Sequence, residues 1–114
     1  MSDACIFCKI IAKEIPSTIV AQNEEIIVIK DINPKAPIHY LIIPKKHVAD
    51  ITKFEASDKD LAGAMVLMAQ QLAQQLPGSK AFRLVVNNGA DAGQIVFHTH
   101  FHFLAGNTLT HNNM

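Results

Sequence analysis

The stretch from Gln94 to Phe103 alternates two kinds of residue, and this alternation constrains the fold more than any other feature of the chain. β-Branched and aromatic residues dominate it, and glycine-containing turns precede and follow it, as expected for a β-strand. Side chains of a strand point alternately to its two faces. The residues predicted to share one face are His98, His100 and His102. Those predicted on the opposite, buried face are Phe97, Thr99, Phe101 and Phe103.

Three histidines in register indicate a functional site, because imidazole serves as base, nucleophile or metal ligand near neutral pH. A lone histidine on a strand is more often an ordinary buried or solvated residue, but half of the six histidines lie within five residues here. On a straight strand, successive imidazoles stand about 6.6 Å apart, twice the rise per residue. One metal ion cannot easily bind all three, so the pattern predicts that their tasks are divided.

The size and charge of the chain exclude several classes of partner. Its 114 residues fit a single domain, 1–114. Ten basic and ten acidic side chains cancel, which predicts neither nucleic acid nor an acidic membrane as a partner. Arg83 is the only arginine, so an anion would be held by backbone amides, histidines or lysines. Without a signal peptide or a membrane-spanning apolar run, we expect a cytoplasmic protein.

Hydrophobic periodicity predicts an α+β domain with a five-stranded antiparallel sheet, one short helix and one long helix. The short helix is expected at 4–13 and the long helix from its N-cap Ser57 to Gln75. An apolar stripe on the long helix consists of Leu61, Met65, Met68, Leu72 and Leu76. The strands are expected at 17–21, 25–30, 38–43, 81–87 and 94–103, with a single turn of helix at 51–54.

Cys5 and Cys8 form a Cys-x-x-Cys half-site for a metal ion. Two thiolates at this spacing can coordinate one tetrahedral zinc ion, although paired cysteines also occur as small buried residues. The candidate partners are distant in sequence, namely His47 at a strand-end corner and His98. Ligand chemistry therefore favours a structural Cys2His2 zinc site that leaves His100 and His102 available for other chemistry.

Several blocks in the same order resemble the histidine triad nucleotide-binding proteins. The run His98-x-His100-x-His102, preceded by Gly93-Gln94, resembles the signature of that family. Asp31-Ile32-Asn33-Pro34 with the following His39 to His47 segment is similar to a second block, and Val85-Val86-Asn87-x-Gly89 to a third. The residues from Cys5 to Ile11 resemble the opening of the zinc-bearing members. The resemblance covers most of the chain and favours the small, phosphoramidase-like branch.

The resemblance implies a homodimer, with two sheets joined into one of ten strands, that binds purine nucleoside monophosphates and hydrolyses their phosphoramidates or related substrates. His100 is the implied nucleophile, and a covalent nucleotidyl-histidine is the implied intermediate. His102 and the backbone near His98 and Gln94 are expected to hold the phosphate. The resemblance further implies that Asp31 binds the ribose and that Ile32 contacts the base. It implies that Asn87 and Gly93 complete the phosphate side of the site. His47 and His98 match the family's zinc positions.

The chain departs from the family pattern at two places. Ile95 stands where the branch usually carries a serine that assists the departing nitrogen, and a hydrocarbon donates no proton. This predicts slower turnover, or a preference for better leaving groups, at a position beside the bound substrate. The tail beyond Gly106 also lacks the tryptophan common in the branch, so tail contacts across a dimer are not carried over.

Two other functions are consistent with the same residues. The first is a non-catalytic dimer that senses nucleotides, in which Ile95 reflects lost turnover. The second is a metal-dependent β-protein that holds a catalytic ion with His98, His100 and a third ligand. A covalent adduct on His100 distinguishes the hydrolase from the sensor, and metal removal distinguishes it from the metalloenzyme.

Overall fold

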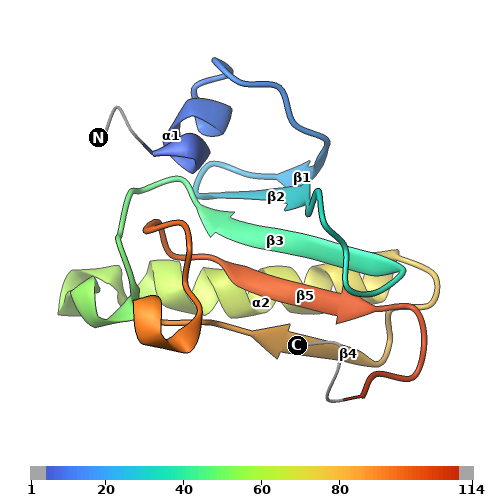
Figure 1. Ribbon diagram of the computed structural model, residues 1–114. Coiled ribbons are helices and arrows are strands. Elements are labelled where there is room, and N and C mark those ends of the chain that lie inside the picture. Colours follow the sequence, from blue (N-terminus) through green and yellow to red (C-terminus); the bar gives the residue numbers. More distant parts are fainter. Residues whose placement is uncertain (1–4, 111–114) are drawn as a thin grey trace.

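The computed structural model describes residues 5–110, which form one five-stranded antiparallel sheet with a short and a long α-helix. The helices are α1 (Ile6–Ile11) and α2 (Lys59–Gln75), and the strands are β1 (Ile19–Gln22), β2 (Ile26–Lys30), β3 (Ile38–Pro44), β4 (Phe82–Val85) and β5 (Phe101–Ala105). The strand order is β1-β2-β3-β5-β4, as Figure 1 shows. The predicted α+β class and sheet are confirmed, whereas the end of the tail, 111–114, lies outside the described residues.

The sheet carries a hydrophobic core on each face, which explains why β2 is apolar from Ile26 to Ile29 without alternation. In β2, Ile26 and Val28 pack in the core formed with α2, while Ile27 and Ile29 pack in the core formed with α1. The long helix α2 crosses the first face, and α1 lies beside the β1–β2 end of the sheet (Figure 1). The second core also includes Leu41 and Ile43 of β3.

The long helix ends at Gln75 as predicted, but it begins differently. Its buried residues include most of the predicted stripe: Leu61, Met65, Met68 and Leu72. Ser57 is not the N-cap, because Glu55 and Asp58 form a capping box in the turn that leads into α2. The Glu55 N–H donates to Asp58 Oδ2 at 2.9 Å. Lys46 Nζ donates to Asp58 Oδ1 at 2.6 Å, which ties the start of α2 to the corner after β3.

The histidine-rich strand is much shorter than predicted, because β5 begins only at Phe101. The preceding segment, 94–100, is held by the corner after β3 instead of by a neighbouring strand. The Thr99 N–H and hydroxyl both donate to the Val48 carbonyl, at 2.6 and 2.7 Å. Only His102 of the three histidines lies in a strand, and Phe97 is 48% exposed instead of buried. Phe103 is fully buried as expected.

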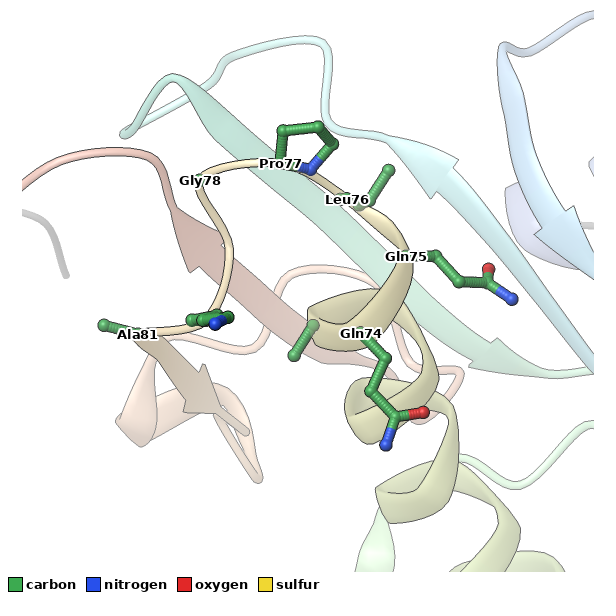
Figure 2. A pocket seen from close by; sticks show the side chains of 8 residues that line it. Gln74, Gln75, Leu76, Pro77, Gly78 and Ala81 are labelled. Atoms are coloured by element: carbon green, nitrogen blue, oxygen red, sulfur yellow. The ribbon is translucent and has the colours of Figure 1, made fainter.

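A surface hollow of about 450 Å³ lies where α2 meets the loop that leads to β4 (Figure 2). The residues that line it are Ala73, Gln74, Gln75, Leu76, Pro77, Gly78, Lys80 and Ala81. This lining contains no histidine, cysteine or acidic side chain, and Lys80 is its one ionisable residue. Among residues 5–110, the helices lack the combined length and apolar character that crossing a bilayer requires.

Candidate active site and metal centre

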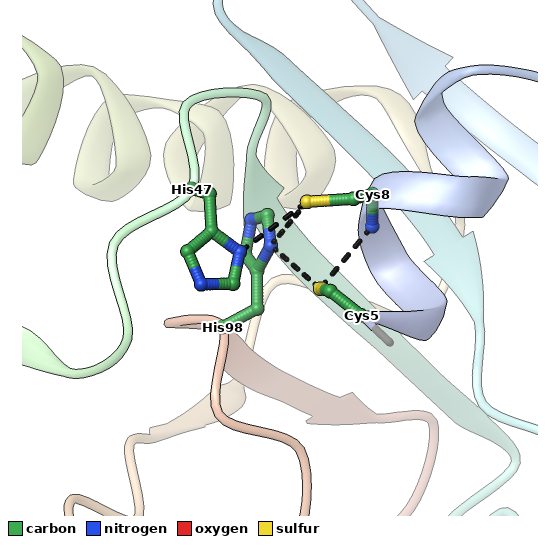
Figure 3. Close-up of side chains that lie close together, drawn as sticks. All are labelled: Cys5, Cys8, His47 and His98. Carbon is green, nitrogen blue, oxygen red and sulfur yellow. Dashed lines mark hydrogen bonds between the residues drawn. The ribbon is translucent and has the colours of Figure 1, made fainter. Parts of the chain in front are cut away.

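Four potential metal ligands from three segments meet beside α1 (Figure 3). Cys5 and Cys8 belong to the start of α1, His47 to the corner after β3, and His98 to the segment before β5. Their ligand atoms all lie within 4.8 Å of one another. The distance from Cys5 Sγ to His98 Nδ1 and that from Cys8 Sγ to His47 Nδ1 are both 3.3 Å. The four residues predicted as one metal site are therefore close enough to bind one ion.

The geometry of this cluster suits a tetrahedral ion bound by thiolates and imidazoles. Usual zinc–sulfur and zinc–nitrogen bond lengths put such ligands roughly 3.5 Å apart. Cys8 Sγ lies 3.3 and 3.6 Å from the Nδ1 atoms of His47 and His98. His98 Nε2 donates to the Pro44 carbonyl at 2.7 Å, so the Nδ1 lone pair faces the sulfurs. A hydrogen bond of this kind typically orients a metal-bound histidine.

His100 is oriented by the backbone two residues before it. Its Nδ1 lies 2.8 Å from the His98 carbonyl oxygen. A carbonyl only accepts, so Nδ1 carries the hydrogen and, in the neutral ring, Nε2 carries the lone pair. The Phe7 ring of α1 packs edge-on against the rings of His98 and His100, with centroid distances of 5.8 and 5.1 Å. Through Phe7, α1 therefore connects the four-ligand cluster of Cys5, Cys8, His47 and His98 to His100.

Burial keeps the imidazoles of His100 and His102 neutral near pH 7. Desolvation lowers the pKa of His100, against the opposing effects of the His98 carbonyl and the Asp31 charge. Desolvation, with smaller contributions from His100 and His39, lowers the pKa of His102 to about 4, against the opposing effect of the Asp31 charge. The site thus offers nitrogen lone pairs and N–H donors instead of fixed positive charge.

A second polar group lies between β3 and β5. His39 Nε2 is 2.9 Å from His102 Nδ1, and Asp31 Oδ2 is 3.4 Å from His39 Nε2. The backbone N–H of Lys35 donates to His39 Nδ1 at 3.0 Å. The rings of His100 and His102 meet edge to face, with centroids 5.2 Å apart. The second group therefore adjoins the predicted nucleophile.

Sequence reasoning assigned His39 no role, although a signal was present. In β3, His39 shares a face with Leu41 and Ile43, because side chains two residues apart point to the same side of a strand. Leu41 and Ile43 pack on the α1 side of the sheet. His102 is the register partner of Leu41 across the β3–β5 ladder. A histidine in phase with the face that carries the other histidines was therefore a candidate for the same site.

Most other predicted binding residues lie in the loops that follow β2 and β4. Asp31 and Ile32 come directly after β2, and Ile32 is 91% exposed. Asn87 is half-buried in the loop after β4. Gly93 has φ +98°, a conformation that favours glycine, and Ile95 is 87% exposed. The exposed isoleucines present apolar surface to solvent on two different loops.

Gln94 differs from these residues because its hydrogen-bonding groups are engaged within the protein. Its side-chain carbonyl accepts from the Gly89 N–H at 2.8 Å, and its side-chain amide donates to the carbonyls of Ala49 and Val96 at 2.7 and 3.0 Å. The Gln94 backbone N–H donates to the Gly89 carbonyl at 3.1 Å. Gln94 therefore organises the loop that precedes the histidines.

The fold and its histidines together define a class of small α+β proteins with an imidazole-rich site on one face of an antiparallel sheet. The HIT domain model matches residues 12–109. The chain belongs to the HIT family, as its resemblance to the histidine triad proteins predicted.

Relatives and solved structures agree with this assignment. An uncharacterised HIT-like protein of Synechocystis is 44% identical over 106 residues, which cover 93% of each chain. The crystal structure of a HIT family hydrolase from Legionella pneumophila is 42% identical, has a TM-score of 0.88, and matches over 94% of this chain and 96% of its own. A histidine triad protein from Clostridium difficile has a TM-score of 0.92 at 36% identity, over 96% of each chain. The protein thus has the fold of HIT family hydrolases.

Proposed function

We propose that the protein hydrolyses purine nucleoside 5′-phosphoramidates, or related AMP- or GMP-linked substrates, through a covalent nucleotidyl-histidine on His100. The observation that carries the proposal is the hydrogen bond from His100 Nδ1 to the His98 carbonyl at 2.8 Å. It leaves the lone pair of a neutral imidazole on Nε2, the state that a nucleophile requires. The match to HIT family hydrolases supports the reaction class.

The proposed reaction has two steps. His100 Nε2 attacks the α-phosphorus, a nitrogen–phosphorus bond forms, and the bond to the leaving nitrogen breaks as that nitrogen takes a proton from water. Water then attacks the phosphorus, breaks the His100–phosphorus bond and releases the nucleoside monophosphate and one proton. During the first step the imidazole becomes cationic, and the His98 carbonyl stabilises that charge through the Nδ1 hydrogen.

The roles of the remaining residues follow the family pattern. We assign His102, Asn87 and Gly93, with the backbone near His98, to the phosphate, Asp31 to the ribose, and Ile32 to the base. Gln94 supports the phosphate side by holding the loop of Gly89. Ile95 lies on the leaving-group side and, being a hydrocarbon, gives the departing nitrogen no proton.

We further propose that Cys5, Cys8, His47 and His98 hold a zinc ion. A closed set of four ligands leaves no open position for substrate, so the bound ion supplies structural cross-linking instead of Lewis-acid chemistry. Thiolate ligands of this kind suit a reducing compartment such as the cytoplasm.

We also propose a homodimer in which β4 pairs with its counterpart in a second copy and extends the sheet. In the described part of the chain, β4 is an edge strand. A groove of about 500 Å³ runs along it, and its lining includes exposed apolar side chains of α2 and β4, among them Val66 and Phe82. An unpaired edge beside exposed apolar surface suits association with an identical strand.

The hydrolase proposal is tested by measuring AMP release from adenosine 5′-phosphoramidate with wild-type protein and with His100→Ala. Turnover by the wild type is expected to fall by about a thousandfold or more in the variant, because no other group replaces the nucleophile. Circular dichroism and thermal melting check that the variant is folded. A mass increase of one nucleotidyl group, trapped by acid quench in the wild type and absent from the variant, identifies the intermediate.

Ile95 favours one alternative, a dimer that binds nucleotide without turnover. Tight AMP binding with no release of AMP from the phosphoramidate contradicts the hydrolase and supports the sensor. Ile95→Ser then asks whether a hydroxyl at this position restores turnover.

A further inference from the structure

We propose that His39 is a positioning residue that fixes the tautomer of His102, so that His102 presents an Nε2–H donor to a phosphate oxygen. This inference rests on the nucleotide-binding function proposed above and adds a residue to it. It is drawn from a continuous series of hydrogen bonds that runs from the Lys35 backbone through the His39 ring to the His102 ring.

The Lys35 N–H determines which atom donates and which accepts along the series of hydrogen bonds. A backbone N–H only donates, so the contact from Lys35 at 3.0 Å makes His39 Nδ1 an acceptor. In the neutral ring, the hydrogen of His39 is then on Nε2. That hydrogen lies between His102 Nδ1, at 2.9 Å, and Asp31 Oδ2, at 3.4 Å. The shorter contact makes His102 Nδ1 an acceptor in turn, and the hydrogen of His102 is on Nε2.

The burial of His39 disfavours the opposite tautomer, in which its hydrogen would be on Nδ1. His39 is 4% exposed, so a reversed tautomer would leave the Lys35 N–H facing an imidazole N–H away from water. Desolvation also lowers the pKa of His39, with Asp31 opposing this effect and Lys35 adding to it. Near pH 7 both rings are therefore neutral, and each has a single hydrogen to place.

The same contacts argue against a metal ion at this group, although Asp31, His39 and His102 lie close enough together to bind one. A metal on His39 Nε2 needs its lone pair there, which moves the hydrogen to Nδ1. His39 Nδ1 faces the Lys35 N–H, so two donors would then oppose each other at 3.0 Å. The group of Asp31, His39 and His102 therefore forms a series of hydrogen bonds. The four-ligand cluster differs, because there the His98 Nδ1 lone pair faces the sulfurs.

The consequence reaches the ligand through His102. With Nδ1 engaged by His39, Nε2 is the ring nitrogen left for a bound molecule, and the side chain keeps 13% of its surface exposed. The His100 ring is its neighbour, with centroids 5.2 Å apart. A phosphate beside the His100 nucleophile would thus meet an N–H donor on His102, whereas the opposite tautomer would present a lone pair and repel the phosphate oxygens.

Two substitutions distinguish the effect of the His39–His102 hydrogen bond from the effect of the volume that the His39 side chain occupies. His39→Leu keeps an apolar volume but donates nothing to His102. His39→Gln is the matched control, because its carboxamide carries an acceptor for the Lys35 N–H and a donor near the position of Nε2. Both full-length, zinc-loaded variants are first compared with the wild type by thermal melting, which measures any purely structural effect.

The direct readout is the tautomer of His102, observed by nuclear magnetic resonance of isotope-labelled histidine nitrogens and assigned by comparison with His102→Gln. The Nε2–H form is expected in the wild type and in His39→Gln, and a mixture of tautomers in His39→Leu. AMP affinity, measured by titration calorimetry, is expected to fall about tenfold in His39→Leu, which corresponds to roughly 1.4 kcal/mol, and to stay within about threefold in His39→Gln.

The inference is overturned if wild-type His102 carries its hydrogen on Nδ1, or if His39→Leu changes neither the tautomer nor AMP affinity. Equal losses of AMP affinity in both variants overturn it too, because they indicate a structural role. Failure of the hydrolase proposal appears separately, as wild-type protein that binds AMP in a His39-dependent way but releases none from the phosphoramidate. Wild-type protein that binds no AMP overturns nucleotide binding and this inference together.

Discussion

The buried imidazole of His102 makes the stability of the protein depend on pH. Desolvation lowers its pKa in the folded state to about 4, below the ordinary value of 6.5. Between these values the unfolded chain binds a proton that the folded protein does not, so acid favours unfolding. The stabilising contribution is complete above about pH 6.5 and is lost as the pH falls towards 4.

The predicted result is a steeper loss of unfolding free energy with acid in the wild type than in His102→Gln. The two slopes are expected to differ by up to about 1.4 kcal/mol per pH unit, the limit for one proton. Urea unfolding at several pH values from 7 to 4.5 measures both slopes. If metal is bound to the four-ligand cluster, its loss in acid would affect both proteins alike, so the difference isolates His102 and the groups that face it. Parallel slopes would contradict the expectation.

The chemistry of individual residues was predictable from sequence where it depends on residue type alone. Cys5, Cys8, His47 and His98 were grouped because thiolates and imidazoles suit one metal, and their atoms do meet. The hydrogen bonds that fix the ring tautomers were not predictable. They depend on where a carbonyl or an amide points, as with the Pro44 carbonyl and His98.

At the scale of elements, α1 is too short to be stable alone and is held in place by its contacts. Isolated helices of fewer than about 12 residues are marginal in water, and α1 has six. Phe7, Cys8 and Ile10 are buried, and the two cysteines lie close to His47 and His98 of the four-ligand cluster. Bound zinc would therefore contribute its binding free energy to the docking of α1 and to the folding of the domain.

Cys5→Ser is accordingly expected to lower the melting temperature of the zinc-loaded protein by about 10 °C or more, from weakened metal binding. Turnover per folded molecule should fall by less than about tenfold, because the ion is not part of the proposed chemistry. Scanning calorimetry with and without chelator measures the first effect, and the phosphoramidate assay below the melting temperature measures the second. In chelator the two proteins should melt together. An unchanged melting temperature with abolished turnover would instead indicate a catalytic metal.

Helices and strands were predicted correctly where their bounds depend on residues nearby in the sequence, and wrongly where they depend on distant contacts. The stripe of α2 lies within one segment, and its end at Gln75 follows from the adjacent Pro77-Gly78. The start of β5 was predicted wrongly because residues 94–100 alternate like a strand. They are instead held by Val48, about 50 residues away, through the backbone N–H and the hydroxyl of Thr99. The N-cap of α2 is Asp58 instead of Ser57, and the Asp58 side chain accepts hydrogen bonds from the Lys46 amine and the Glu55 N–H.

At the scale of the whole molecule, the two edges of the sheet differ in their suitability for a partner. The β1 edge is interrupted by a register shift between Ile19 and Ala21, and such irregularities discourage pairing with another strand. The β4 edge pairs with β5 in continuous register. It also adjoins the groove that contains Val66, which is 54% exposed. These features favour β4 as the edge used by the proposed homodimer.

Val66→Glu is therefore expected to convert the protein from a dimer to a monomer at micromolar concentration. A carboxylate at this position would lose its hydration where two copies meet, and burying an unpaired charge costs several kcal/mol. Val66 is exposed in the single chain, so the variant should fold with an almost unchanged secondary structure. Ile19→Glu, on the opposite edge and 42% exposed, is the matched control and should remain dimeric. Light scattering coupled to gel filtration measures the mass of each. A dimer disrupted by Ile19→Glu alone would move the interface to β1, and a monomeric wild type would remove the dimer from the proposal.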